Sequence, residues 1–295
     1  MALAKLSEQS STAFADPVGP GVSLGLVVKY GLLLLALAFV LLPLYWMVVT
    51  SFKLRPEIFL STPTFFPSEP TLENYVNLFA SRNVTQFLIN SAIVVTTAVV
   101  LSMVIGSVAA YSLARFRLVF GLDRHLGFWI LTTRMIPAIV IIVPIYVMVR
   151  DLGLINTYLG LSLVYAAFNL PFVIWMMRSF FAEIPVDLEE AAMVDGDNRL
   201  TAFWRIVLPL SAPGLVATSI FAVITTYNEF LFALILTSTA DAMTMPVGTS
   251  TLIGRIQSSW GEMTAIAAIG ILPILIFALA VQRHLVRGLT MGAIK

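Results

Sequence analysis

The chain has 295 residues, of which 59% are hydrophobic and only 11% are charged, and its mean hydropathy is +0.95. Soluble domains carry about 25% charged residues, so this composition excludes an ordinary soluble protein and predicts an integral membrane protein. The formal net charge of +1 gives no indication of a nucleic-acid partner, and the absence of cysteine excludes disulfides and thiolate chemistry.

The N-terminal segment is polar. Residues 1–26 contain Ser, Gln, Pro and Gly and lack an apolar core. We expect them to form a mobile cytoplasmic tail and not a cleaved signal peptide. Residues 27–295 are expected to form one membrane domain.

Six apolar segments follow the tail. A bilayer-spanning helix needs about 20 mostly apolar residues. The segments that meet this requirement are 30–52, 84–114, 126–149, 158–177, 210–236 and 263–282. A short surface helix is expected to begin at Leu72-Glu73-Asn74-Tyr75. The sequence therefore predicts an all-α, polytopic fold with six transmembrane helices.

Lys and Arg are distributed unequally between the two sides of these spans. Eleven lie on the side that carries both termini and the loop 178–208, and five lie on the other side. The larger number marks the cytoplasmic side. Both termini and this loop are therefore predicted to be cytoplasmic.

The same loop, at about 182–209, contains the run Glu190-Ala191-Ala192-Met193-Val194-Asp195-Gly196, followed after nine residues by Ile206-Val207-Leu208-Pro209. The pattern is E-A-A-x3-G-x9-I-x-L-P. A short helix over 186–194 would present two alanines on one face, where another protein could approach closely. Gly196 permits a turn with positive φ, a second short helix is expected over 200–207, and Pro209 breaks the chain before the next span.

This pattern resembles the coupling motif of the membrane subunits of bacterial binding-protein-dependent ABC importers. Two more runs resemble the carbohydrate branch of that family, of the maltose-importer type. They are Tyr227-Asn228-Glu229-Phe230-Leu231-Phe232-Ala233-Leu234 and Gly288-Leu289-Thr290-Met291-Gly292-Ala293-Ile294-Lys295. The resemblance extends from about Leu32 to the end of the chain.

The resemblance implies a permease of the bacterial inner membrane that imports a sugar by alternating access. Its implied partners are a second permease, two ATPase subunits that bind ATP and Mg, and an extracytoplasmic sugar-binding protein. The residues that would couple this chain to the ATPase are Glu190, Ala191, Ala192, Asp195, Gly196, Ile206, Leu208 and Pro209. The flanking carboxylates Glu189 and Asp197 are interpreted as charges that favour the helix macrodipole.

No catalytic constellation is visible in the sequence. It contains no G-x-x-x-x-G-K-[ST] phosphate loop, so ATP hydrolysis is expected in a separate subunit. His125 and His284 are far apart along the chain and predict no metal site. We therefore expect a transport permease and not an enzyme.

Arg134 lies about nine residues into the third predicted span, roughly 13 Å deep at 1.5 Å per residue. A charge at this depth is costly, and it usually faces a cavity or a partner. Three interpretations remain open. Arg134 pairs with a carboxylate of this chain or of a partner permease, or it binds sugar hydroxyls in the translocation path, or it neutralises an anionic substrate.

Two groups of polar residues accompany Arg134 as candidates for the substrate path. One comprises Thr132, Thr133 and Asn169, close to the helix-breaking residues Pro137, Pro144 and Pro171. The other comprises Tyr227, Asn228 and Glu229 in the fifth span. The competing interpretations are simple helix kinking for the first group and interhelical hydrogen bonding for the second. The predicted path residues are Arg134, Thr133, Asn169, Tyr227, Asn228 and Glu229.

Several alternatives stay open. A secondary transporter would use Glu229 for ion coupling, although the sequence shows no repeat. A structural membrane protein would leave Arg134 and the coupling pattern unexplained. Polyols, glycerol phosphate or peptides are possible substrates within the importer class. The loop 237–262 either contacts the binding protein or holds a re-entrant helix, and the tail 283–295 either approaches the ATPase or anchors the chain.

Overall fold

The computed structural model describes residues 24–81, 83–116, 122–255 and 259–291. The predicted N-terminal tail lies outside the described residues except for 24–26. The chain divides into two compact units, residues 1–46 and 47–295. All regular structure in the described ranges is helical, which confirms the predicted all-α class.

In the first unit, the described residues form most of helix α1 (Leu24–Ser51). This helix carries no charged residue after Lys29. Side chains 25–46 are exposed and almost all apolar, as expected for a helix that is surrounded by acyl chains. The first predicted span, 30–52, is therefore helical along nearly its whole length.

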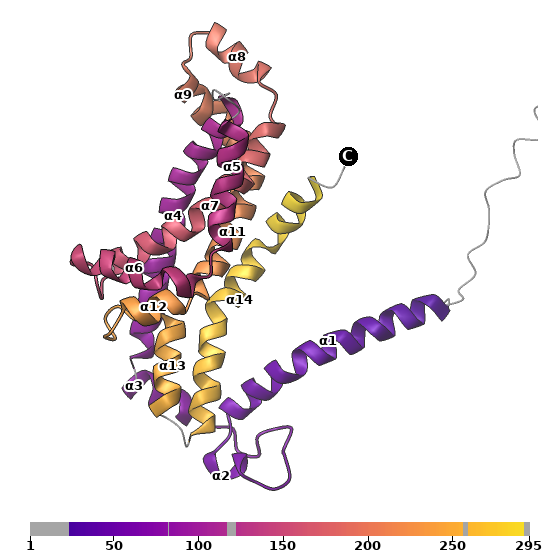
Figure 1. Cartoon of the computed structure of the whole chain (residues 1–295). Helices are drawn as coiled ribbons and strands as arrows, with labels where there is room; N and C mark the ends of the chain where they lie inside the picture. Colours follow the sequence, from indigo (N-terminus) through magenta and orange to yellow (C-terminus); the bar gives the residue numbers. More distant parts are fainter. Residues whose placement is uncertain (1–23, 82, 117–121, 256–258, 292–295) are drawn as a thin grey trace, which may run out of the picture. The chain divides into compact units, whose positions relative to one another are not determined.

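The second unit is built on two long helices, α4 (Val84–Arg115) and α7 (Tyr158–Glu183); α11 (Ala212–Tyr227) packs on both, and α14 (Trp260–Met291) packs on α11 (Figure 1). The second, fourth and sixth predicted spans are confirmed as continuous helices. Gly106 lets α4 and α7 approach closely, because a Cβ at this position would lie 2.6 Å from Val173 Cγ1.

The third predicted span is not one straight helix. It consists of α5 (Leu122–Thr132), the 3-10 turn η2 (Thr133–Met135) and α6 (Ala138–Asp151), and its two halves meet at 95°. Pro137 causes the break, because it lacks an N–H and forces Ile136 into an extended conformation, with φ −72° and ψ 122°. Pro144 and Pro171, in contrast, lie inside continuous helices.

The fifth predicted span is also broken. Helix α11 ends at Tyr227, and α12 (Leu231–Leu236) follows after a three-residue interruption. At its other end α11 meets the preceding helical segment, Arg199–Leu210, at 75°. Four described helices are thus long and apolar enough to cross a membrane, and the number rises to six if each bent pair counts as one span. The predicted count of six holds on that condition.

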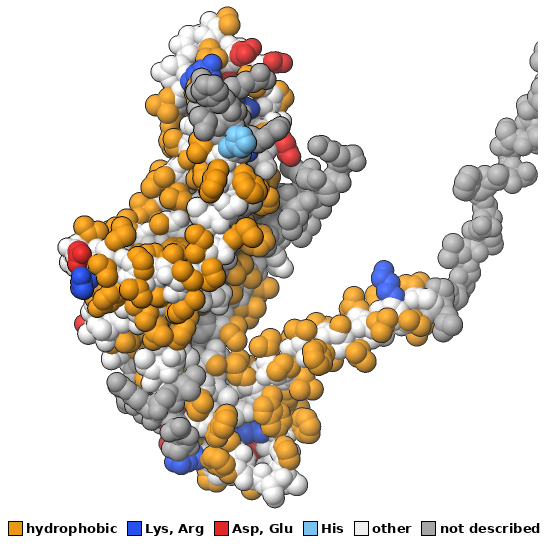
Figure 2. Space-filling view, viewed as in Figure 1, with side chains coloured by type: hydrophobic (Ala, Val, Ile, Leu, Met, Phe, Trp, Pro, Cys, Tyr) orange, Lys and Arg blue, Asp and Glu red, His pale blue; other side chains and the backbone are white. Residues whose placement is uncertain are grey.

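Shorter helices lie at the two ends of this unit (Figure 1). At one end are α8 (Asp187–Val194) and α9 (Arg199–Ala202), and at the other are α2 (Arg55–Ile58), α3 (Glu73–Ser81) and α13 (Met245–Arg255). Helix α3 begins within the predicted run. In Figure 2, hydrophobic side chains cover much of the visible face between the two ends, and acidic side chains gather at the α8 end.

The loop 237–262 is held to the helices on which it lies. Asn90 Nδ2 donates to the carbonyls of Ala240 and Met243, both at 2.8 Å, and the Met245 N–H donates to Ser91 Oγ at 2.7 Å. Helix α13 occupies the second half of the loop and packs on α4 and α14. The loop therefore contains a helix, and both its re-entrant character and its contact with a binding protein stay predictions.

Candidate functional site

A polar cavity of about 200 Å³ lies where the two broken spans meet α7. Its walls come from η2 and the start of α6, from one face of α7, from the end of α11 and from α12. The lining residues are Arg134, Ala138, Tyr165, Phe168, Asn169, Thr225, Thr226, Glu229 and Phe232. Three of the six predicted path residues, Arg134, Asn169 and Glu229, thus come together here.

Arg134 lies in the 3-10 turn η2 between α5 and α6. Its side chain is exposed, and its guanidinium carbon lies 5.2 Å from the centre of the Phe172 ring, in cation–π contact. Among the described residues, no carboxylate lies within ion-pair distance of Arg134. Of the three interpretations, pairing within the described part of this chain finds no support, and the other possibilities stay open.

Glu229 occupies the interruption between α11 and α12. Its Oε1 accepts a hydrogen bond from the Phe232 N–H at 3.1 Å, and its Oε2 accepts one from the Ala233 N–H at 3.4 Å. These bonds cap α12, whose N-terminal amides favour a negative charge. The carboxylate therefore stabilises the helix break and at the same time forms part of the cavity wall.

Asn169 joins α7 to α11. Its Nδ2 donates to Thr226 Oγ1 at 2.7 Å, and Thr225 Oγ1 lies 3.5 Å from its Oδ1. The side chain is buried. Asn169 thus forms an interhelical hydrogen bond and also lines the cavity.

The other three predicted path residues do not line the cavity. Thr133 Oγ1 donates to the Ile130 carbonyl at 2.6 Å, Tyr227 to the Gly270 carbonyl at 2.8 Å, and Asn228 Nδ2 to the Ile224 carbonyl at 2.8 Å. These side chains satisfy backbone groups of their own or neighbouring helices.

Sequence reasoning missed six residues of the wall: Ala138, Tyr165, Phe168, Thr225, Thr226 and Phe232. Phe168 and Phe232 form an aromatic pair with ring centres 4.5 Å apart. Most of these residues lie three or four positions from Asn169 or Glu229 along a helix. That spacing was the available signal, since such neighbours share a helix face.

The predicted docking loop forms the α8 end of the second unit. After α8, the N–H groups of Asp195, Gly196 and Asp197 donate to the carbonyls of Ala191, Met193 and Ala192 at 3.0–3.2 Å. Gly196 has φ +100°, as predicted for a helix-ending glycine. Asn198 caps α9 by accepting from the Thr201 N–H at 2.8 Å.

The structure leaves most of the predicted coupling residues accessible. Glu190, Ala191, Asp195, Gly196 and Pro209 are exposed, and Ala192, Ile206 and Leu208 are half-buried. The second short helix extends further than predicted. It continues from α9 through a π-helical turn, η3 (Phe203–Val207), and through α10 (Leu208–Leu210), so the chain bends at Ser211 and not at Pro209.

The docking loop also exposes apolar residues that the sequence analysis did not select. Val194 is 87% exposed and Leu200 is 65% exposed, one on each side of the Gly196 turn. Large apolar side chains in a loop predicted to face water were the available signal, because such exposure accompanies interaction surfaces.

Glu189 lies in the first turn of α8, where the helix dipole favours a carboxylate, but the interpretation as a simple dipole charge was incomplete. Glu189 is only 3% exposed, and its carboxylate is paired with Arg115 at the end of α4, at 2.5 Å. Asp197 forms an exposed pair with Arg205 at 3.4 Å. No feature of the sequence connects Glu189 to a partner 74 residues away, because only the packing of α8 against the end of α4 brings them together.

We compared the chain with known proteins. Residues 102–291 match the family described as "Binding-protein-dependent transport system inner membrane component". Among the described residues, no group of three or more His, Asp or Glu side chains could hold a metal ion.

Two curated relatives align over most of their length. Diacetylchitobiose uptake system permease protein DasC of Streptomyces coelicolor is 38% identical over 253 residues, which is 86% of this chain and 91% of the relative. Trehalose/maltose transport system permease protein MalG of Thermococcus litoralis is 36% identical over 258 residues, or 86% and 91% of the two chains.

A solved structure has a similar fold. It is a chain from the crystal structure of a bacterial ABC transporter involved in the import of the acidic polysaccharide alginate. The TM-score is 0.77 at 23% identity, over 91% of this chain and 99% of the other.

Proposed function

Because the chain belongs to the family of inner membrane components of binding-protein-dependent transport systems, we propose that it is the permease subunit of an ATP-driven sugar importer that works by alternating access. As a member of this family it is a transport component and not an enzyme. The sugar substrate is inferred from relatives whose names specify diacetylchitobiose, trehalose or maltose.

The observation that carries this proposal is the docking loop. Helix α8 and the Gly196 turn present exposed small, acidic and apolar residues at one end of the helix bundle. A partner ATPase that engages this surface would bind ATP and Mg in its own chain. Two such subunits would pull two permeases together as they close. In this orientation α8 and both termini face the cytoplasm, in agreement with the excess of Lys and Arg on that side.

The cavity is the proposed part of the substrate path in this chain. Arg134, Asn169 and Glu229 offer donors and acceptors to hydroxyl groups, and Phe168 and Phe232 offer apolar faces. Ligand sites typically enclose about 300–1,000 Å³. At about 200 Å³ the cavity is smaller, which fits one wall of a path completed by a second, different permease. An extracytoplasmic sugar-binding protein would deliver the substrate.

The ion-coupled alternative required a carboxylate that is free to bind and release an ion. Both oxygens of Glu229 accept backbone hydrogen bonds at the start of α12. Releasing this carboxylate would leave two amides at the start of α12 without an acceptor. No observation on this chain favours the secondary-transporter interpretation over the importer.

The proposal is tested by purifying the tagged chain from its native membrane and identifying the accompanying proteins by mass spectrometry. We expect a P-loop ATPase, a second polytopic permease and, with substrate present, a binding protein. A homo-oligomer of this chain alone would contradict the proposal.

A pair of glycine variants tests the docking loop itself. Gly196→Pro should abolish ATPase retention and transport, because proline cannot adopt φ +100° and removes the N–H that donates to Met193. Gly153→Pro is the matched control. Gly153 also has a positive φ of +70°, also donates its N–H, and lies in the turn between α6 and α7. The control should retain the ATPase, and equal loss in both variants would contradict the assignment.

A further inference from the structure

We propose that Glu189 is the positioning residue that makes α8 and α4 move as one body, so that a displacement of the docking loop reaches the membrane-spanning core without slack. This inference rests on the proposed docking function. It concerns a residue just before the E-A-A pattern, on the side of α8 that faces the bundle.

The carboxylate of Glu189 is held from two directions. Arg115 Nε donates to Oε1 at 2.5 Å, and the Tyr111 hydroxyl donates to Oε2 at 2.5 Å. Tyr111 and Arg115 lie one turn apart at the end of α4. Two bonds from one helix fix both the position and the rotation of the carboxylate, which a single contact would not do.

Arg115 extends this joint to a third helix. Its Nη2 donates to the Ile184 carbonyl at 2.9 Å, directly after the end of α7. The planar guanidinium has donors in a rigid arrangement, so it can hold the end of α7 and the start of α8 at once. The start of the docking loop is thereby fastened to both central helices of the bundle.

The joint is shielded from water. The side chains of Arg115 and Glu189 are 5% and 4% exposed, and Tyr111 packs on Phe203 and Phe181 with ring centres 4.7 Å and 6.2 Å apart. In such surroundings an ion pair is screened little by salt, and breaking it leaves an uncompensated buried charge. The joint should therefore stay closed while the loop is under load.

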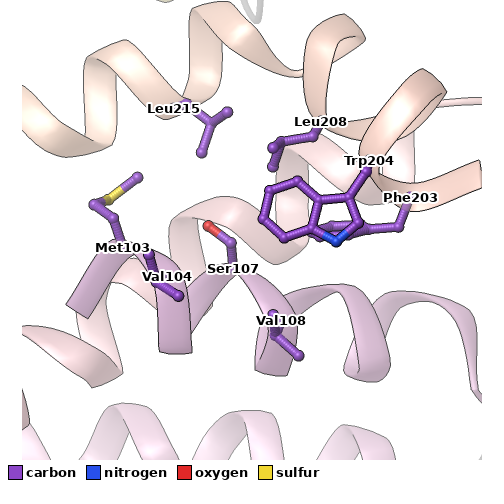
Figure 3. A pocket seen from close by; sticks show the side chains of 8 residues that line it. All are labelled: Met103, Val104, Ser107, Val108, Phe203, Trp204, Leu208 and Leu215. Carbon is purple, nitrogen blue, oxygen red and sulfur yellow. The ribbon is translucent and has the colours of Figure 1, made fainter. Parts of the chain in front are cut away.

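Another contact between this loop and α4 is of a different kind. Beside Phe203, an apolar pocket of about 130 Å³ separates the η3–α10 segment from α4 (Figure 3). Its lining is Met103, Val104, Ser107, Val108, Phe203, Trp204, Leu208 and Leu215. The buried Ser107 hydroxyl, directed toward this space in Figure 3, has no hydrogen-bond partner among the described residues. This contact has free volume and lacks directional bonds, so it transmits displacement less faithfully than Glu189 does.

The absence of native cysteine makes the joint measurable by spin labelling. Cysteines introduced at the exposed positions Asp187 on α8 and Ser112 on α4 report the distance between the two helices. In the purified full-length chain, wild-type background should give one narrow distance distribution. The double variant Arg115→Met/Glu189→Leu should broaden this distribution.

The double variant is chosen because apolar replacement of a buried pair often preserves stability. A narrow distribution at the wild-type distance in a folded double variant would overturn the proposal. Tyr111→Phe is the second variant, in case the first does not fold. This variant keeps the ion pair between Arg115 and Glu189 but removes the hydrogen bond from Tyr111 to Glu189. We expect it to broaden the distance distribution less than the double variant does. Asp197→Asn, in the exposed pair, should leave the distribution unchanged.

A second measurement uses the complex with its co-purified ATPase and the label at Ser112 alone. Adding ATP and vanadate should change the spectrum of the wild-type complex. The double variant should retain the ATPase but lose this change. If the wild-type chain retains no ATPase, the docking function fails, and the joint is then judged on the distance distributions alone.

Discussion

Two arginines near the apolar core of this protein have opposite surroundings. Arg115 is buried, and two of its nitrogens are committed to Glu189 and to the Ile184 carbonyl. Arg134 is exposed at the wall of the polar cavity, where its guanidinium lies over the Phe172 ring. The charge of Arg115 therefore holds helices together, whereas the charge of Arg134 is accessible to another molecule.

This difference shows that the position of a charged residue in the sequence does not reveal whether the residue serves stability or ligand binding. From the sequence, Arg134 was conspicuous because it interrupts an apolar segment, and Arg115 was one of several loop residues. In the structure, Arg115 has the more extensive network. A charge that is fully paired is predicted to act on stability and geometry, and a charge with donors to spare is predicted to act on ligands.

The largest effect is expected from Glu189→Ala. The substitution leaves the Arg115 guanidinium buried without its carboxylate, which typically costs about 3–5 kcal/mol. The free energy of unfolding in detergent should fall by an amount of this order. A loss below that of the exposed-pair variant Asp197→Asn would show that Arg115 is not committed as the structure indicates.

Arg115→Lys should have an intermediate effect. A lysine keeps the charge, but one ammonium cannot reproduce the two directions held by the guanidinium. Leaving one buried acceptor unsatisfied costs about 1–3 kcal/mol. The same unfolding measurement tests this, and full wild-type stability would argue against the importance of the bond to Ile184.

Arg134→Ala should affect transport more than stability, whereas substitutions at Arg115 should affect mainly stability. Its stability cost should stay at or below about 1 kcal/mol, the value of an exposed cation–π contact, while sugar uptake should fall. Uptake by membrane vesicles with the binding protein present measures the second effect. Arg150→Ala is the matched control, because Arg150 is an exposed arginine at the end of the same broken span. Equal uptake in both variants would contradict a role for Arg134 in the path.

The smallest effect is expected from Asp197→Asn. Arg205 and Asp197 are 72% and 28% exposed and lie 3.4 Å apart. Exposed pairs of this kind contribute about 0–1 kcal/mol. Unfolding should therefore shift little, and the small shift should disappear at high salt. A loss of stability that persists at high salt would show that this pair is shielded from solvent, as the pair of Glu189 is.

The sequence by itself determined the features that depend on local chemistry. Charge-free runs of sufficient length identified the membrane class and four continuous helices, and Gly196 was recognised because its position requires a positive φ. The coupling pattern also identified the family before any geometry was known. Each of these inferences uses residues that are close together along the chain, so no tertiary contact was needed.

Only the tertiary structure decided which distant residues meet. In a hydropathy profile, the break at Ile136–Pro137 and the interruption at Glu229 cannot be told from the rest of the apolar spans. In the structure, they bring Arg134, Asn169 and Glu229 to one cavity. Glu189 contacts Arg115, 74 residues away along the chain, because α8 folds back against the end of α4. Burial is a property of packing and cannot be read from local sequence. Of two similar carboxylates in the docking loop, packing buries Glu189 in the pair with Arg115 and leaves Asp197 in an exposed pair with Arg205.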